Sequence, residues 1–166
     1  MIVSNFYMLR KERGRMNLIT TNGTDKRFCD LCSQLDEALD EAVGGEKQRS
    51  QYVQYNQLDD IHDVVLACNH ETTLGCGSFK RYDEQTAEIK RVFVKKEFRR
   101  NKVAVHIMKE LERIAATKGY QRLILETGMP LKAAIKLYES LGYHVIPNYG
   151  QYANMDESVC MEKLLK

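Results

Sequence analysis

The chain has 166 residues, enough for one domain that buries about two thirds of the surface of its unfolded form. Its 43% hydrophobic and 29% charged residues are typical of a globular protein, and a net charge of +2 gives no support to a nucleic-acid-binding module. No apolar run is long enough to span a bilayer, and the first residues lack the pattern of a secretory signal. We therefore expect a cytoplasmic protein that binds neither nucleic acid nor membrane.

Residues 1–15 carry no hydrophobic pattern, and we expect them to form a flexible extension before a single domain over 16–166. An arm that docks on a partner is the alternative for this extension. Because no linker or internal repeat follows, the pattern predicts no second domain.

The five cysteines are expected to be free thiols in a reducing compartment. Cys29 and Cys32 form a C-x-x-C pair, which is found in redox sites and in half of a zinc site. However, Phe28, Cys32 and Leu35 share one helical stripe, and the chain has no second C-x-x-C. We interpret these cysteines as packing residues. The histidines show no ligand spacing either, so no metal site is expected.

Hydrophobic periodicity and turn residues predict the following elements in chain order. They are a strand over 17–21, a helix capped by Thr24 or Asp25 and ending near Val43, a short helix over 46–58, three strands over 63–68, 74–82 and 87–94, a helix over 102–118, a strand over 122–127, a helix over 131–142, and two strands over 143–146 and 158–163. The three consecutive strands are expected to form an antiparallel meander. The later strand–helix–strand order favours a parallel, right-handed crossover.

This order indicates a single-domain fold of the α/β (α+β) class. We expect a mixed, mostly antiparallel sheet of about six to seven strands, with helices on both faces.

The stretch from Lys90 to Lys102 holds seven Lys or Arg residues and one acid. A solvated basic turn is the ordinary interpretation of such a run. Its position favours an anion site instead, because a strand ends and a helix begins there, so unpaired N–H groups and the positive end of a helix dipole converge. Neither a P-loop nor a dinucleotide-binding glycine motif is present.

At this point the sequence resembles a known family. "FRRNKVAVHIMKELERIA" is similar to motif A of the GNAT acyl-CoA N-acyltransferases, Gln/Arg-x-x-Gly-x-Gly/Ala. Arg99 matches its first position and Ala104 its last, whereas Lys102 replaces the first glycine. "AAIKLYESLGYHVI" resembles the final helix and strand of the family, Ala-x-x-Leu-Tyr-x-x-x-Gly-Phe. The two motifs cover about residues 87–146, and the element order fits over 17–163.

The resemblance implies that acetyl-CoA is the cosubstrate. Its pyrophosphate would lie on the amides of residues 100–105, helped by nearby cations, and its pantetheine arm would pair with a central strand that splays from its parallel neighbour. The implied cofactor-binding residues are Val92, Phe93, Val94, Arg99, Arg100, Asn101, Lys102, Val103, Ala104 and Val105.

Two residues are candidates for proton transfer. Glu88 resembles the glutamate of histone-acetylating relatives that removes a proton from the amine, and period-two alternation predicts that Glu88, Lys90 and Val92 share one face of the strand. A structural ion pair with Lys90 or Arg91 is the alternative. Tyr138 matches the tyrosine that many GNAT enzymes direct at the CoA sulfur as general acid, and packing on the amphipathic helix face is its alternative.

The acceptor site is less defined. GNAT folds bind acceptors where this chain has Tyr55, Asn56, Glu126, Tyr149 and Tyr152, although each residue is equally suited to a structural role. Cys76 and Cys160 lie in predicted strands and are interpreted as packing residues, with thiol catalysis as the alternative.

The sequence therefore predicts an acetyl-CoA-dependent N-acetyltransferase that moves an acetyl group to a primary amine by direct transfer in a ternary complex. A small or amino-acid-like amine is the first expectation. The alternatives are a protein lysine or N-terminal acetyltransferase and a catalytically idle acyl-CoA sensor. The tail after residue 145 resembles small bacterial GNAT proteins. The acceptor, the acyl-chain length and the oligomeric state, a homodimer included, are left open.

Overall fold

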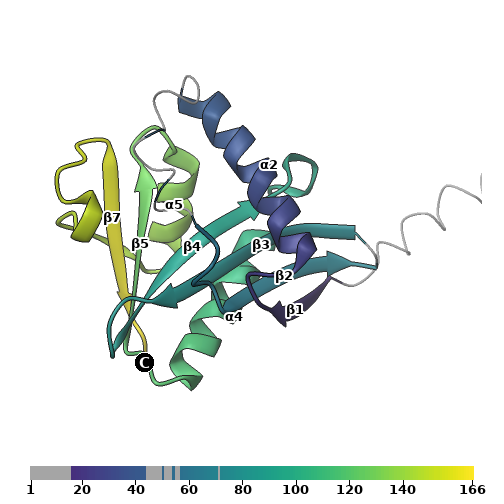
Figure 1. Ribbon diagram of the computed structural model, residues 1–166, viewed down its shortest axis with the longest axis horizontal. Helices are drawn as coiled ribbons and strands as arrows, with labels where there is room; N and C mark the ends of the chain where they lie inside the picture. Colours follow the sequence, from purple (N-terminus) through teal and green to yellow (C-terminus); the bar gives the residue numbers. More distant parts are fainter. Residues whose placement is uncertain (1–15, 44–49, 51–53, 55–56, 71) are drawn as a thin grey trace, which may run out of the picture.

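The computed structural model describes residues 16–43, 50, 54, 57–70 and 72–166. Its elements, shown in Figure 1, are β1 (Asn17–Thr21), α2 (Lys26–Val43), β2 (Asp63–Asn69), β3 (Thr72–Arg81), β4 (Thr86–Val94), η1 (Lys96–Phe98), α4 (Val103–Thr117), β5 (Arg122–Gly128), α5 (Lys132–Ser140), β6 (His144–Ile146), η2 (Gly150–Tyr152) and β7 (Ser158–Leu164). The expected extension over 1–15 and most of the helix expected over 46–58 lie outside the described residues. Within the described segments, no helix is both long and apolar enough to cross a bilayer.

The strands form one seven-stranded sheet in the order β1-β2-β3-β4-β5-β7-β6. The pair β4–β5 is parallel, whereas the other neighbouring pairs are antiparallel. This arrangement confirms the predicted mixed sheet and the meander over β2, β3 and β4. The parallel pair is joined through α4, as the strand–helix–strand order required.

Helices cover both faces of the sheet (Figure 1). Helices α4 and α5 pack on one face, where Ile107, Leu111 and Tyr138 join the larger buried cluster. Helix α2 packs on the other face through Phe28 and Leu31. The two faces of the sheet therefore have separate hydrophobic cores.

Local signals fix the ends of these helices. The Asp25 carboxylate accepts the backbone N–H of Arg27 at 2.9 Å, so Asp25 rather than Thr24 caps α2. Helix α4 ends beside Gly119, whose φ of +91° lies in the left-handed region that glycine tolerates best. Cys32 lies buried in the α2 core, as expected of a packing cysteine.

A β-bulge in β4 corrects one prediction. Arg91 has a φ of +59°, and the pairing with β3 shifts between Ser78↔Lys90 and Cys76↔Phe93. As a result Val92 packs in the α4 core and does not share a face with Glu88. Period-two alternation fails here because the bulge inserts one extra residue into the strand.

Candidate active site

The parallel pair at the centre of the sheet opens after three residue pairs. Strand β4 pairs with β5 only at Thr86, Ala87 and Glu88, while β5 continues to pair with β7 as far as Gly128. In the described part of the chain, the later part of β4 therefore has no strand neighbour on the β5 side. This splay lies where the family resemblance expected backbone groups for the pantetheine arm. One such group is already occupied, because Arg99 Nε donates to the Val94 carbonyl at 3.0 Å.

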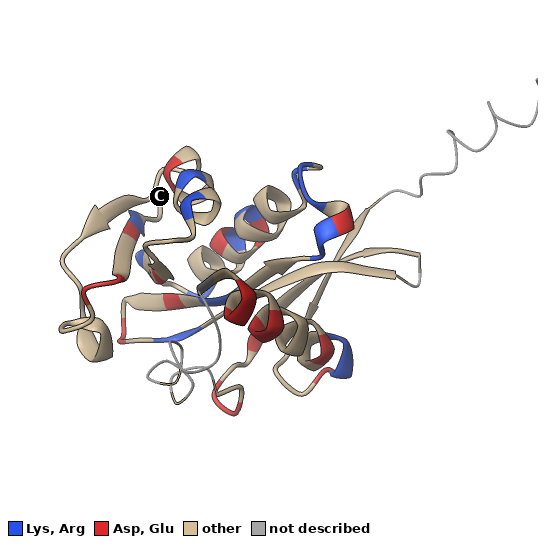
Figure 2. Cartoon of the chain, turned by 90° about the horizontal axis from the view of Figure 1, so that it is seen from above, with Lys and Arg blue, Asp and Glu red and all other residues tan. Residues whose placement is uncertain are grey.

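A basic turn leads from the end of β4 into α4. In Figure 2 the Lys and Arg positions of this turn form a basic segment before the helix, whereas acidic positions recur along α2. Arg100 and Lys102 both have positive φ angles, +66° and +59°. Lys102, which stands where the family motif has its first glycine, therefore lies in the left-handed region that glycine tolerates best.

The first turn of α4 offers amides to an anion. Lys102 is its N-cap residue and makes no side-chain capping bond. The first helical hydrogen bond runs from the His106 N–H to the Lys102 carbonyl at 3.1 Å, which leaves the amides of Val103, Ala104 and Val105 without an intrahelical partner. Donors, helix dipole and cations converge here, so these residues fit a pyrophosphate. Arg99 turns back toward β4, with its guanidinium 6.0 Å from the centre of the Phe93 ring.

Glu88, in the last β4–β5 pair before the splay, is the centre of a buried polar cluster. Its side chain is almost fully buried, and its Oε1 accepts a hydrogen bond from the Tyr149 hydroxyl at 3.0 Å. Lys90 Nζ lies 3.8 Å from the same oxygen, at the distance of an ion pair. The predicted alternative for Glu88, an ion pair with Lys90, is thus present.

Lys90 is itself buried and makes its hydrogen bond to a neutral group. Its Nζ donates to the Tyr152 hydroxyl at 3.0 Å and lies 5.7 Å from the centre of that ring. Burial lowers the pKa of the Lys90 amine, and the charge of Glu88 opposes this shift. The sequence pattern indicated Lys90 as part of a basic run and as a possible ion-pair partner of Glu88, but not its burial or its bond to Tyr152.

Glu126 contributes a second buried carboxyl from β5. It accepts the Ser158 hydroxyl at 2.6 Å and is the register partner of Cys160 on β7. Burial raises the pKa of Glu126, while the Ser158 hydrogen bond and the charge of Lys90 act in the opposite direction. Burial also raises the pKa of the Cys160 thiol to about 11, which disfavours the thiolate needed for thiol catalysis.

Three tyrosines form the wall of this cluster. The rings of Tyr82 and Tyr149 are 5.4 Å apart, and those of Tyr149 and Tyr152 are 5.6 Å apart, both edge to face. Burial followed by the charge of Glu88 raises the pKa of the Tyr149 and Tyr152 hydroxyls, so both stay protonated at neutral pH. These hydroxyls bind the protein's own charged pair, a partnership that the sequence did not predict.

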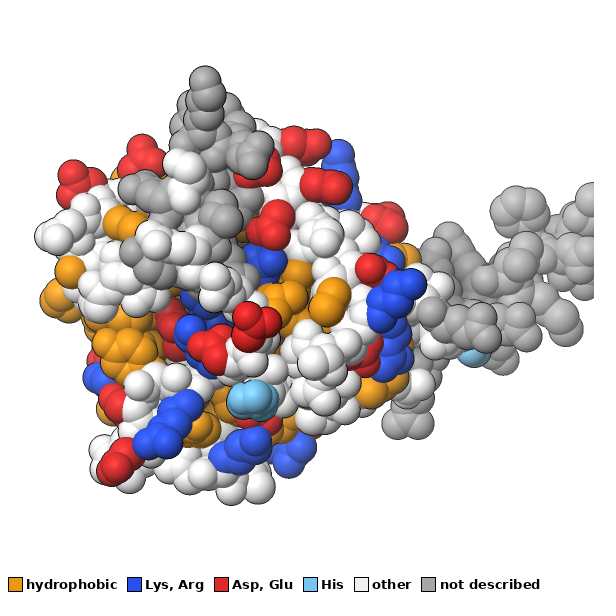
Figure 3. Space-filling model, viewed as in Figure 1, with side chains coloured by type: hydrophobic (Ala, Val, Ile, Leu, Met, Phe, Trp, Pro, Cys, Tyr) orange, Lys and Arg blue, Asp and Glu red, His pale blue; other side chains and the backbone are white. Residues whose placement is uncertain are grey.

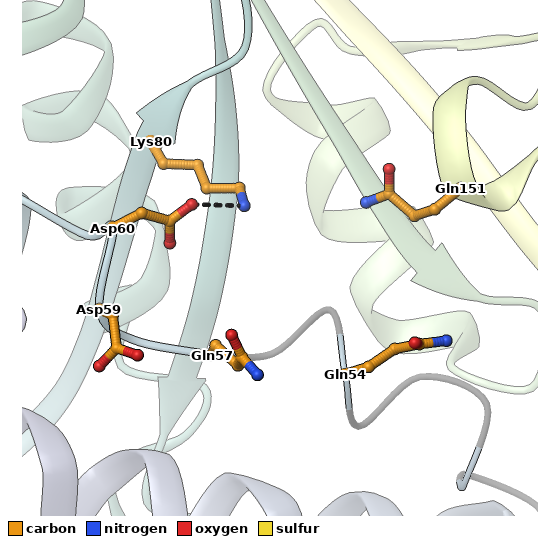
Figure 4. Close-up of a pocket in the computed structure, with 6 residues that line it drawn as sticks. All are labelled: Gln54, Gln57, Asp59, Asp60, Lys80 and Gln151. Carbon is orange, nitrogen blue, oxygen red and sulfur yellow. Dashed lines mark hydrogen bonds and ion pairs between the residues drawn. The ribbon is translucent and has the colours of Figure 1, made fainter.

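A polar cavity of about 350 Å³ adjoins the cluster (Figure 4). Its lining residues are Gln54, Gln57, Asp59, Asp60, Lys80 and Gln151. Lys80 is the register partner of Glu88 on β3, and Gln151 lies between the two site tyrosines in the chain. Lys80 and Gln151 face one another across the opening, and Lys80 binds Asp60 at 2.9 Å. Charges of both signs lie side by side on this face in Figure 3.

The remaining predicted residues have different surroundings. Tyr55 and Asn56 lie outside the described residues. Tyr138 lies in the α5 core, with its ring 5.9 Å from that of Tyr143 in an edge-to-face contact. Burial and then the charge of Glu126 raise the pKa of the Tyr138 hydroxyl. The ring of Tyr138 therefore packs in the core, and its hydroxyl keeps its proton at neutral pH.

Sequence reasoning missed several members of the site, namely Lys80, Gln151 and Ser158. Lys90 was expected only as a possible ion-pair partner of Glu88 on the same strand face. The three missed residues depend on loop and strand partners far apart in the chain, which periodicity does not report.

A mixed sheet whose one parallel pair splays beside an uncapped helix N-terminus defines an acyl-CoA N-acyltransferase type of fold. Comparison with known proteins agrees. The model of the acetyltransferase (GNAT) family matches residues 32–143. The chain therefore belongs to the GNAT acetyltransferase family.

Individual relatives match parts of the chain. The uncharacterized N-acetyltransferase YsnE of Bacillus subtilis is 36% identical over 93 residues, which cover 55% of this chain and 62% of YsnE. An IAA acetyltransferase of Azospirillum brasilense is 29% identical over 136 residues, 81% of this chain and 88% of the relative. The matches span 62%, 40% and 56% of relatives from Bacillus subtilis, Xenopus tropicalis and Schizosaccharomyces pombe.

Solved structures show the same fold over nearly the whole chain. A Klebsiella pneumoniae protein assigned to the acyl-CoA N-acyltransferases has a TM-score of 0.74 and 25% identity, covering 91% of this chain and 98% of that one. PaiA N-acetyltransferase of Thermoplasma acidophilum, solved in complex with coenzyme A, has a TM-score of 0.71 and 18% identity, covering 90% and 99%.

Proposed function

We propose that the protein is an acetyl-CoA-dependent N-acetyltransferase that transfers the acetyl group directly to a primary amine in a ternary complex. One observation carries this proposal. The splay after Glu88 continues to the open amides of α4, and Lys80, the register partner of Glu88 on β3, lines the polar cavity. We infer that acetyl-CoA enters along the splay and the acceptor through the cavity, so that the two substrates meet beside Glu88.

For acetyl-CoA, the amides of residues 100–105 would hold the pyrophosphate, and Val92 and Phe93 would offer backbone groups to the pantetheine arm. The Arg99–Val94 bond closes the end of this path and fixes the turn relative to β4. The bulge at Arg91 turns the strand where the thioester would lie.

Glu88 is proposed to take a proton from the acceptor. A primary ammonium with a pKa of about 10.4 is mostly protonated at neutral pH, and only the neutral amine attacks a thioester. Tyr149 and Lys90 hold Glu88 in place.

Tyr138 is proposed to donate to the departing CoA sulfur. Replacing Tyr138 with Phe should lower kcat by at least about tenfold while the affinity for acetyl-CoA stays near that of the wild type. Steady-state kinetics and acetyl-CoA titration check this, and full activity of the variant would remove Tyr138 from the mechanism.

The polar lining of the cavity supports a small, polar amine as acceptor. Its volume of about 350 Å³ suits a metabolite better than an extended peptide. We also place Glu126, Tyr149 and Tyr152 in the acceptor site, because all three lie within or border the cluster that the cavity adjoins.

A panel of amines and peptides, assayed for release of free CoA, tests the function. We expect acetyl-CoA to raise the Tm and small polar amines to be turned over. Turnover of peptides alone would indicate a protein acetyltransferase, and stabilisation without any turnover would indicate an acyl-CoA sensor. An unchanged Tm at saturating acetyl-CoA would contradict the whole proposal.

A further inference from the structure

Lys90 differs from every other lysine that the structure describes, since it alone is buried. The half-buried lysines bind carboxylates closely, as Lys80 does with Asp60 at 2.9 Å and Lys163 with Glu112 at 2.7 Å, or, like Lys95, remain partly exposed. Among the described residues, Lys90 Nζ makes one hydrogen bond, to the neutral Tyr152 hydroxyl. An ammonium group has three donors, so this buried amine is incompletely bonded.

The position of Lys90 is that of an acceptor amine. It follows the last β4–β5 pair by two residues, so its backbone lies where the splay begins. Its Nζ lies 3.8 Å from Oε1 of Glu88, the proposed proton acceptor. The chain therefore brings its own primary amine to the point where the two substrate paths meet.

Burial leaves part of the Lys90 amine neutral. It lowers the pKa of Lys90, and the charges of Lys80 and Arg91 act in the same direction, while the charges of Glu88 and Glu126 oppose the shift without reversing it. A larger fraction of Lys90 is therefore nucleophilic near neutral pH than of an exposed lysine.

We propose that Lys90 is an acetylation site that the protein modifies itself, an inference that rests on the proposed function. The neutral Nζ attacks the thioester carbon, a C–N bond forms and the C–S bond breaks. The nitrogen gives its proton to Glu88, and CoA leaves as a thiolate that is protonated to the thiol. Lysine and acetyl-CoA thus become acetyl-lysine and CoA, with no further reactant.

Acetylation of Lys90 would lower the acetyltransferase activity of the enzyme. Acetyl-Lys90 has no positive charge, so Glu88 loses its ion-pair partner and the acetyl group occupies space beside the cavity. A good acceptor amine competes for the same thioester and protects Lys90. The modification would therefore accumulate when acetyl-CoA is abundant and acceptor is scarce.

Peptide mapping by mass spectrometry tests the proposal on the full wild-type chain incubated with acetyl-CoA and no amine. Exposed Lys96, in the basic turn, is the internal control for chemical acetylation. We expect Lys90 to gain an acetyl group at least about tenfold faster than Lys96, because the bound thioester is held beside it. In urea-unfolded chain the two lysines should react alike, and Glu88→Gln should slow only Lys90.

Dilution of the protein and substitution of Lys90 provide two further tests. Transfer within one chain gives a rate that does not fall when the protein is diluted at constant acetyl-CoA, and Lys90→Arg should remove the fast acetylation. If the protein turns over amines while Lys90 reacts no faster than Lys96, the inference is overturned and the proposed function stands. If acetyl-CoA does not bind at all, both are overturned.

Discussion

At the scale of single residues, Glu88 is a carboxylate that the protein holds almost without solvent. Its Oε1 accepts the Tyr149 hydroxyl and lies at ion-pair distance from Lys90 Nζ. Such a carboxylate is fixed in orientation before any substrate arrives. Orientation of this kind is what general-base catalysis requires.

Replacing Glu88 with Gln should therefore lower kcat/KM by roughly 10²-fold or more at low pH and by less at high pH. At high pH more of the acceptor amine is already neutral, so removal of its proton by Glu88 contributes less to the rate. The pH–rate profile of CoA release measures this. Glu84→Gln, in an exposed turn before the same strand, is the matched control and should keep the wild-type profile.

Glu126 gives a prediction about stability. Burial raises its pKa above the ordinary value of 4.5, so its contribution to stability is complete below that value and is lost as the pH rises through the folded-state pKa. Glu126→Gln keeps an acceptor for the Ser158 hydroxyl but cannot ionise. The variant should have a higher Tm than the wild type at pH 8.

The advantage of Glu126→Gln should shrink as the pH falls toward 4.5. Thermal unfolding across this range measures it, with exposed Glu139→Gln as a variant expected to follow the wild type throughout. A constant difference at all pH values would mean that the effect comes from packing rather than from ionisation.

At the scale of elements, two glycines in β3 govern how its neighbours approach. A Cβ at Gly77 would lie 2.7 Å from Cγ2 of Ile107 and 2.9 Å from Cδ1 of Leu111, both on α4. A Cβ at Gly75 would meet the Phe93 carbonyl at 2.5 Å. The glycines therefore let the helix and β4 pack closely against β3.

Gly77→Ala should destabilise the protein by about 1–3 kcal/mol, because the new methyl group overpacks the α4 core. The free energy of unfolding in urea measures this loss. At Gly128 a Cβ would meet its nearest atoms at 3.6–3.8 Å, an ordinary contact distance. Gly128→Ala should change stability by less than about 0.5 kcal/mol. Equal effects of the two variants would contradict the packing argument.

The elements also show where sequence reasoning succeeds and where it stops. Helix α4 was predictable because Val103, Ile107 and Leu111 repeat at helical spacing and bury one stripe. The sheet face on which Val92 lies was not predictable, because the hydrophobic pattern does not show where a one-residue bulge falls in the strand. Likewise the Tyr149–Glu88 bond joins residues 61 positions apart, a separation over which local periodicity carries no information.

At the scale of the whole molecule, charge is separated although the net value is only +2. The turn before α4 is basic, whereas α2, on the other face, carries Asp30, Asp36, Glu37, Asp40 and Glu41 (Figure 2). A polyanion such as acetyl-CoA would be attracted to the basic end and repelled from the acidic helix. Local charge, and not net charge, should then govern its affinity.

This separation predicts that acetyl-CoA binds more weakly as salt is added. Between about 0.05 and 0.5 M salt the Kd should rise several-fold, because the screening length falls below the spacing of exposed charges. Arg100→Gln in the basic turn should weaken binding at low salt and flatten this dependence. Lys26→Gln at the start of α2 changes the net charge equally and should do neither. Titration of acetyl-CoA into each variant at several salt concentrations measures both effects. Equal effects of the two substitutions would show that net charge governs binding. The turn before α4 would then not be where the diphosphate lies.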